Sequence, residues 1–144
     1  MMKKLTLFLL ILLPLAAAAQ QPRLEDLAAR LETNRISVHY ACTVMQPAPV
    51  KLAGELLVQG ECYRSIGNGM EIYCDGATRW SVDPEALEVY IETAGGLEEL
   101  VAWQDNLEDL SLTNVSYLPL SDDLSAFRFD TSSLGADWVV TDLR

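Results

Sequence analysis

The sequence has few of the groups that enzymes use. Its 144 residues include one histidine, His39, and contain no H-E-x-x-H, G-x-S-x-G or phosphate-loop pattern. His39 falls within a strand pattern and has no partnered nucleophile, so we expect it to make a local hydrogen bond rather than to catalyse. We therefore predict that the protein is not an enzyme and has no catalytic residues.

Basic residues are also scarce. The chain has 10 Lys and Arg against 21 Asp and Glu, a formal net charge of −11. Such a surface repels phosphate backbones and anionic headgroups, which excludes nucleic acid as a partner. Asp122-Asp123 lacks the spaced oxygen ligands of a calcium loop, and Asp83 and Glu85 flank Pro84 in a turn. We expect structural roles for these carboxylates, with no metal and no cofactor.

The three cysteines do not form a metal-binding pattern, because no Cys-x-x-Cys or Cys/His cluster occurs. Cys62 and Cys74 flank the turn signal Gly67-Asn68-Gly69. A three-residue loop there places Cys62 opposite Cys74, which allows a disulfide in an oxidising compartment. A two-residue Asn-Gly turn instead places Cys62 opposite Asp75 and leaves two buried free thiols. We predict the Cys62–Cys74 disulfide, with Cys42 unpaired.

No apolar run reaches the roughly 20 residues needed to cross a bilayer. Lys3 and Lys4 precede an apolar run from Leu5 to Leu15, and alanines follow it, which is the pattern of a secretory signal peptide. We predict a signal peptide over residues 1–19, cleaved after Ala19. The remaining residues, 20–144, are predicted to form one soluble domain of the periplasm. No cysteine lies near the cleavage site, so we expect neither a lipid anchor nor a membrane anchor.

Two segments have helical periodicity and the others alternate as strands do. Helices are predicted over Pro22–Glu32, with Leu24, Leu27 and Leu31 on one face, and over Leu97–Asn106, with Leu97, Leu100 and Val101 on one face. Strands are predicted over Ile36–Val44, Lys51–Arg64, Met70–Cys74, Thr78–Val82, Leu87–Ile91, Leu112–Leu118, Ala126–Thr131 and Trp138–Asp142. The predicted fold class is α+β, with a curved antiparallel sheet covered by the two helices.

Several short motifs follow one another along the predicted meander and at the end of the chain. They are Gly54-Glu55-Leu56-Leu57-Val58-Gln59, Tyr73-Cys74-Asp75-Gly76, Thr78-Arg79-Trp80, Val82-Asp83-Pro84, Glu88-Val89-Tyr90, Phe127-Arg128-Phe129-Asp130 and Val140-Thr141-Asp142-Leu143-Arg144. In their order and spacing they resemble the LolA-like outer-membrane lipoprotein carrier family. The resemblance covers most of Leu24 to Ile91 and the last twenty residues.

The resemblance implies an incompletely closed half-barrel whose inner face holds the acyl chains of lipoproteins or lipids, with proteins of envelope lipoprotein sorting as partners. It assigns ligand contact to apolar side chains of the sheet and helices: Leu24, Leu27, Leu31, Leu56, Val58, Met70, Ile72, Trp80, Val82, Leu87, Val89, Ile91, Leu97, Leu100 and Val101. The alternative is that these side chains fill a core, in which case the protein is a periplasmic sensor or regulatory interaction module.

The chain departs from the family in two places. The family has a basic residue and a proline directly after the G-x-L-x-V strand, where this chain has Gln59-Gly60-Glu61. No lid-closing arginine is therefore expected here. The family's middle strands have no counterpart between Asn106 and Ser125, so the sheet is expected to be smaller.

Overall fold

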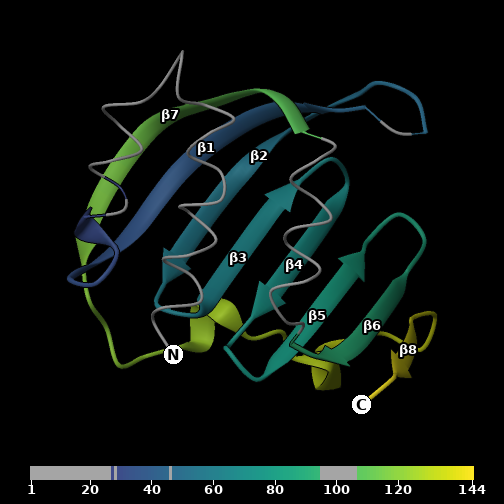
Figure 1. Cartoon of the computed structure of the whole chain (residues 1–144). Helices are drawn as coiled ribbons and strands as arrows, with labels where there is room; N and C mark the ends of the chain where they lie inside the picture. The colour runs from purple at the N-terminus through teal and green to yellow at the C-terminus, as the bar shows by residue number, and fades with distance from the viewer. Residues whose placement is uncertain (1–26, 28, 46, 95–106) are drawn as a thin grey trace.

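A computed structural model describes residues 27, 29–45, 47–94 and 107–144. The described residues form one curved sheet of eight strands in the order β7-β1-β2-β3-β4-β5-β6-β8 (Figure 1). The strands are β1 (Asn34–Val44), β2 (Val50–Gln59), β3 (Cys62–Gly67), β4 (Met70–Cys74), β5 (Thr78–Asp83), β6 (Glu88–Thr93), β7 (Leu107–Pro119) and β8 (Val139–Asp142).

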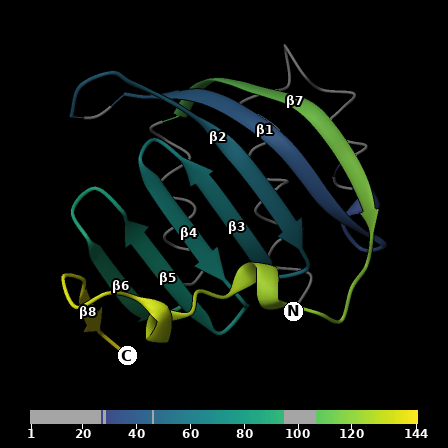
Figure 2. The same cartoon turned by 180° about the vertical axis from the view of Figure 1, so that it is seen from behind.

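The sheet is mixed rather than antiparallel. Strands β1 to β6 form an antiparallel meander, and β7 also pairs antiparallel with β1. The chain then crosses one face of the sheet to reach its far edge, where β8 runs parallel to β6. Strands β6 and β7 run in the same direction, and the return path (Figure 2) carries the chain back across the sheet from the end of β7, so β8 runs parallel to β6.

The predicted α+β class with two covering helices is wrong. Helical backbone in the described part of the chain is confined to residues 27, 29 and 30 and to two 3-10 turns, η1 (Ser125–Phe127) and η2 (Thr131–Ser133). Most of the helix predicted over Pro22–Glu32, and all of the one predicted over Leu97–Asn106, lie outside the described residues. No helix among the described residues has the length and apolar character needed to cross a membrane.

Two predicted strands differ from the structure because a glycine turn in one and a side-chain cap in the other override the apolar pattern. The segment Lys51–Arg64 is two strands, since Gly60 adopts a φ of +59° and the two-residue turn after Gln59 pairs that residue with Cys62. The segment Ala126–Thr131 is not a strand. Within it Asp130 accepts a hydrogen bond from the backbone N–H of Ser132 at 2.9 Å, which caps η2.

The two faces of the sheet carry separate cores. On the first, which we call the Leu27 face, Leu27 and Leu31 pack on strands β1, β2 and β7 together with Ile36, Val38, Cys42, Val58, Leu110 and Leu112. On the second, which we call the Phe127 face, the buried residues Val82, Val89 and Ile91 of β5 and β6 pack with Tyr73, Trp80, Phe129, Leu134 and Trp138. The sheet therefore uses opposite faces at its two ends.

The segment after β7 is fixed across the Phe127 face. The guanidinium of Arg35 lies 4.8 Å from the centre of the Phe127 ring and donates to Gln59 Oε1 at 3.0 Å and to the Asp123 carbonyl at 2.9 Å. The amide of Gln59 in turn donates to the Ser121 carbonyl at 2.8 Å. Phe127 is completely buried beneath these contacts. The middle of this face is thus occupied by the chain itself.

Candidate functional site

The apolar side chains assigned to one ligand-binding face lie on two faces. Register pairing places Ile72 of β4 opposite Ser81 of β5, so Trp80 and Val82 point to the other side of the sheet from Ile72. Leu56, Val58, Met70 and Ile72 share the Leu27 face, whereas Trp80, Val82, Val89 and Ile91 share the Phe127 face. The prediction of one continuous lining across all these strands is wrong, because Cys74 pairs with Arg79 and not with Thr78, which places Trp80 and Val82 on the face opposite to Ile72.

The residues on the Phe127 face are core residues. Val82 and Val89 are 1% and 0% exposed and pack against aromatic side chains of the returning segment. Leu87 is a turn residue and not a strand residue, since β6 begins at Glu88 and Leu87 has a positive φ of 58° in the β5–β6 turn. Apolar side chains packed in this way have no room for a ligand without displacement of the chain that covers them.

The predicted helix residues divide into two groups. Leu27 and Leu31 are each 2% exposed and belong to the core at the β7–β1–β2 end. They help to support the Leu27 face and are not free to contact a ligand. The remaining predicted helix contacts, Leu24, Leu97, Leu100 and Val101, lie outside the described residues.

What remains is a strip of half-buried apolar side chains on the Leu27 face of β2, β3 and β4, which we call the apolar strip: Leu56, Tyr63, Met70 and Ile72. Tyr63 was not predicted as a site residue. The two-residue turn at Gly60-Glu61 was the signal that could have revealed it, because this turn places Tyr63 opposite Val58. Half-buried apolar side chains in a row are the type of surface that a flexible apolar ligand covers.

The strip ends at an ion pair. On β5 and β6 the same face carries Arg79 opposite Glu92, and a nitrogen of the Arg79 guanidinium lies 2.8 Å from Glu92 Oε2. The side chains are 20% and 36% exposed, so the pair is in contact with solvent. The Leu27 face is therefore apolar on β2, β3 and β4 and charged on β5 and β6. An amphiphile has the same arrangement, with an apolar chain at one end and a polar headgroup at the other.

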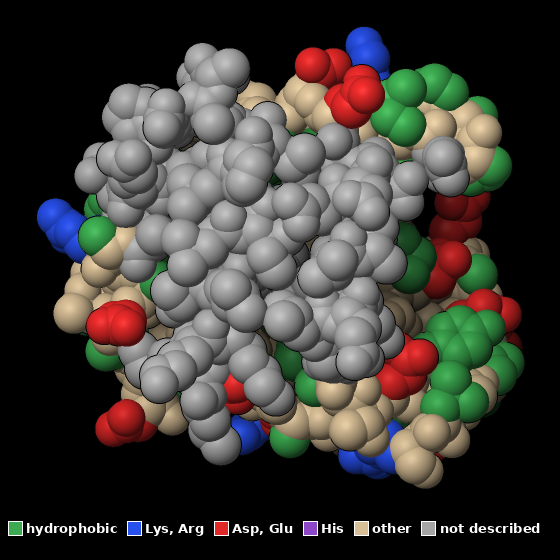
Figure 3. All heavy atoms as spheres, in the orientation of Figure 1, with side chains coloured by type: hydrophobic (Ala, Val, Ile, Leu, Met, Phe, Trp, Pro, Cys, Tyr) green, Lys and Arg blue, Asp and Glu red, His purple; other side chains and the backbone are tan. Residues whose placement is uncertain are grey.

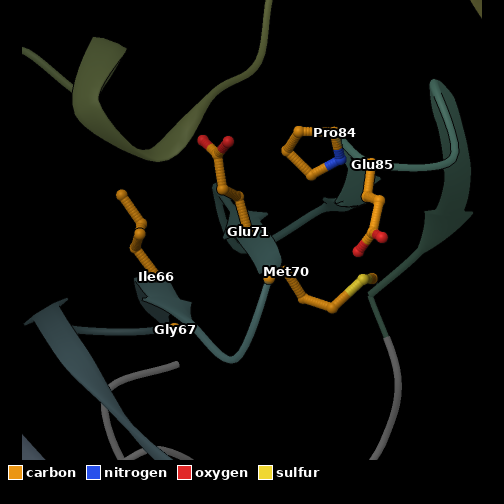
Figure 4. Close-up of a pocket in the computed structure, with 7 residues that line it drawn as sticks. Ile66, Gly67, Met70, Glu71, Pro84 and Glu85 are labelled. Atoms are coloured by element: carbon orange, nitrogen blue, oxygen red, sulfur yellow. The ribbon is translucent and has the colours of Figure 1, made fainter.

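A cleft adjoins the strip at the β3–β4 turn (Figure 4). It has a volume of about 310 Å³ and is lined by Ile66, Gly67, Gly69, Met70, Glu71, Pro84 and Glu85. In Figure 4 the Met70 side chain extends toward Glu85, while the Glu71 carboxylate points away from Met70. The volume is at the lower end of the range for small-molecule sites, roughly 300–1,000 Å³. Met70 belongs to both the cleft and the strip and so joins them.

A second cleft of about 420 Å³ lies at the β1–β2 end, beside the side chains of Ala41, Cys42, Thr43, Lys51, Leu52, Ala53, Asn68 and Asp109. Its lining takes residues from both faces of the sheet, since Ala41 and Cys42 are neighbours on β1. Both clefts are open to solvent. Neither encloses a ligand as a deep cavity does.

The thiols contradict the predicted disulfide. The β3–β4 turn has two residues, so Tyr63 pairs with Cys74, and alternation then places Cys62 and Cys74 on opposite faces. Cys42, Cys62 and Cys74 are all free and buried. Burial raises the pKa of each thiol above its ordinary value, which keeps it protonated and unreactive.

The polar residues considered in the sequence have local partners. His39 Nε2 lies 3.3 Å from Glu55 Oε1, and its Nδ1 lies 3.2 Å from the Asn114 side-chain amide, which confirms the expected local hydrogen bonding. Asp123 accepts a hydrogen bond from the backbone N–H of Ser125 at 3.0 Å. Asp83 likewise accepts one from the Ala86 N–H at 3.1 Å.

Tyr73 lies on the Phe127 face and has a raised pKa. Burial, and then its hydrogen bond to Glu71, raise the pKa of Tyr73 to about 12. Its ring packs against Phe129 with centroids 5.4 Å apart, so it is a core residue. Over the described ranges, no three His, Cys, Asp or Glu side chains are grouped so that they could hold a metal ion.

Comparison with known proteins gives no family for this chain. A scan against protein-family models found no match, and a search of curated proteins found no similar sequence.

Proposed function

We propose that the protein is a non-catalytic carrier of the bacterial periplasm, related to the LolA-like lipoprotein carriers, which binds an acyl chain along the apolar strip. The observation that supports this most is the arrangement of the Leu27 face. Leu56, Tyr63, Met70 and Ile72 are half-buried there, while the core of the Phe127 face is filled by the protein's own chain. The N-terminal signal pattern, with its predicted cleavage after Ala19, supports the proposed location.

The polarity of the strip suits an amphiphilic ligand. An acyl chain laid across β2 to β4 covers apolar side chains, and its headgroup then lies near the Arg79–Glu92 pair and solvent. Each fully buried methylene contributes about 0.8 kcal/mol, so eight give roughly 6 kcal/mol before the costs of ordering. We therefore expect reversible binding in the micromolar range or weaker, which a carrier that must release its ligand requires.

The test is a titration with a fluorescent fatty acid and with a diacylated lipopeptide. Ile72→Asp introduces a charge into the strip and should weaken binding at least tenfold, because a carboxylate at an apolar contact must be desolvated. Ile66→Asp is the matched control. Ile66 lies on the neighbouring strand β3, is also half-buried, and faces the opposite side of the sheet.

The outcome separates the candidate sites. Weaker binding in the Ile66 variant alone would place the ligand in the 310 Å³ cleft and not on the strip. No saturable binding by folded wild-type protein would overturn the proposal and leave the interaction module as the better hypothesis. Circular dichroism of each variant shows whether it is folded. Ile72→Ser provides a milder change if the aspartate variant is not.

A further inference from the structure

The edge of the sheet at β8 exposes apolar side chains. Val139 and Leu143 are 58% and 59% exposed, the highest values among the large hydrophobic residues of the described chain, and Tyr90 is 40% exposed. Val139 pairs with Glu88 and Thr141 with Tyr90, so Val139, Leu143 and Tyr90 share one face. Figure 3 shows apolar side chains beside acidic ones at the margin of the molecule where β6 and β8 lie.

The same edge has free main-chain groups. The N–H of Val139 donates to the Leu87 carbonyl at 2.9 Å, and the N–H of Leu143 donates to the Ile91 carbonyl at 2.8 Å. Along a strand, alternate residues direct their N–H and C=O groups to opposite sides. Those of Val140 and Asp142 therefore point away from β6, as a template for one more strand.

The opposite edge is built differently. Strand β7 has two register shifts against β1, and Asp109 and Asn114 have positive φ values of 54° and 52°. Bulges of this kind bend an edge strand and protect it from pairing with another chain. The short β8 edge shows no positive φ at any residue from Val139 to Arg144. It is the edge that remains suited to pairing.

We propose that β8 is a self-association surface, on which the β8 strand of a second copy of this chain pairs antiparallel about Thr141. A two-fold axis there hydrogen-bonds Val140 to the partner's Asp142 and, by symmetry, Asp142 to the partner's Val140. It also places Val139 directly opposite the partner's Leu143, and by symmetry Leu143 opposite the partner's Val139. The two most exposed apolar side chains thus cover each other, and no two charges of like sign face each other across the new pair.

Other occupants and registers fit less well. An axis at Val140 would place Leu143 opposite the partner's Asp137, a carboxylate against an apolar side chain. A basic peptide would be attracted by the acidic chain, whose net charge is −11, but nothing in its sequence need match the alternation of β8. A second copy presents the same β8 sequence, so its two most exposed apolar side chains lie opposite those of the first copy. This inference does not rest on the proposed acyl-chain function.

The two occupants respond to salt in opposite ways. Two copies of an acidic chain repel each other, and salt screens this repulsion, so self-association should strengthen as ionic strength rises. Binding of a basic partner should weaken instead. Sedimentation equilibrium of protein purified after expression of the full chain, over a range of concentration and salt, measures this. We expect a monomer–dimer equilibrium that shifts toward dimer with salt.

Paired substitutions test the register. Val139→Lys and Leu143→Glu should each weaken the dimer roughly tenfold, which corresponds to about 1.4 kcal/mol. The double variant should regain most of that loss, because the introduced lysine of each copy would face the introduced glutamate of the other on both sides of the axis. Within one chain the two positions are about 13 Å apart along the strand, so they cannot compensate each other there. Val50→Lys is the control, because Val50 is 49% exposed and lies on β2.

A second variant addresses the main chain without changing these side chains. Val140→Pro removes an N–H that points away from β6, so it should abolish association while the monomer stays folded. A wild-type protein that remains monomeric at all concentrations and salts would overturn the proposal. The same holds if Val50→Lys weakens association as much as Val139→Lys does, or if the double variant gives no recovery.

Discussion

Replacing Phe127 with alanine removes the largest completely buried side chain of the described structure. Phe127 is the point at which η1 is fixed to the Phe127 face, with the Arg35 guanidinium 4.8 Å from its ring. A buried phenylalanine truncated to alanine typically costs about 3–5 kcal/mol, and loss of the cation–π contact adds roughly 0.5–1 kcal/mol. Total stabilities of single domains are about 5–15 kcal/mol, so the variant should be close to its limit.

Urea unfolding followed by circular dichroism measures this change. The midpoint should fall with little change in slope, because the surface exposed on unfolding is nearly the same. Leu120→Ala is the matched control in the same segment. Leu120 is 51% exposed, and its truncation should change stability by less than about 0.5 kcal/mol. A Phe127→Ala loss below about 1 kcal/mol would refute the inference that this residue fixes the segment to the sheet.

Two further predictions concern the cysteines and an acidic turn. Thiol counting on denatured, non-reduced protein should find all three cysteines free, and a count of one would show that the β3–β4 register is wrong. Asp75→Asn should make thermal stability less sensitive to acid. Burial raises the Asp75 pKa, but the N–H groups of Thr78 and Ala77 and the Arg128 guanidinium outweigh it and lower the pKa overall. This stabilisation is present above the ordinary Asp pKa, about 3.9, and is lost as the pH falls through the lowered value. Melting temperatures measured across acid pH compare the two proteins, and identical profiles would contradict the assignment.

Local turn signals predicted part of the meander, but they missed the β2–β3 hairpin within Lys51–Arg64. The strand Met70–Cys74 is present with its expected bounds, because the Asn68-Gly69 and Asp75-Gly76 turns delimit it on both sides. Which side chains share a face across strands was not predictable in the same way. One residue more or less in a loop inverts the parity of the next strand, and this happened both for Cys62 against Cys74 and for Ile72 against Trp80.

The parallel β8 could not be foreseen from periodicity either. A four-residue strand pairs according to where the preceding segment brings it, and that path depends on the burial of Phe127 and the Arg35 contacts on a distant strand. Tertiary packing also decides the predicted ligand residues: of the eleven that lie in the described ranges, six are buried in the two cores. The sequence shows that these side chains are apolar. Whether an apolar side chain is covered by a ligand or by other parts of the chain depends on its tertiary contacts, which the sequence does not show.

The pairing of β7 with β1 has a consequence for the order of folding. The six strands of the meander pair with sequence neighbours, so each hairpin closes a short loop. Strand β7 must instead join Asn34 to Pro119, and β8 must join Glu88 to Val139. Contacts of such long sequence separation form slowly, so the meander should acquire protection from hydrogen exchange first. Both edges of the sheet would be completed last, and until then β1 and β6 are the strands exposed to aggregation.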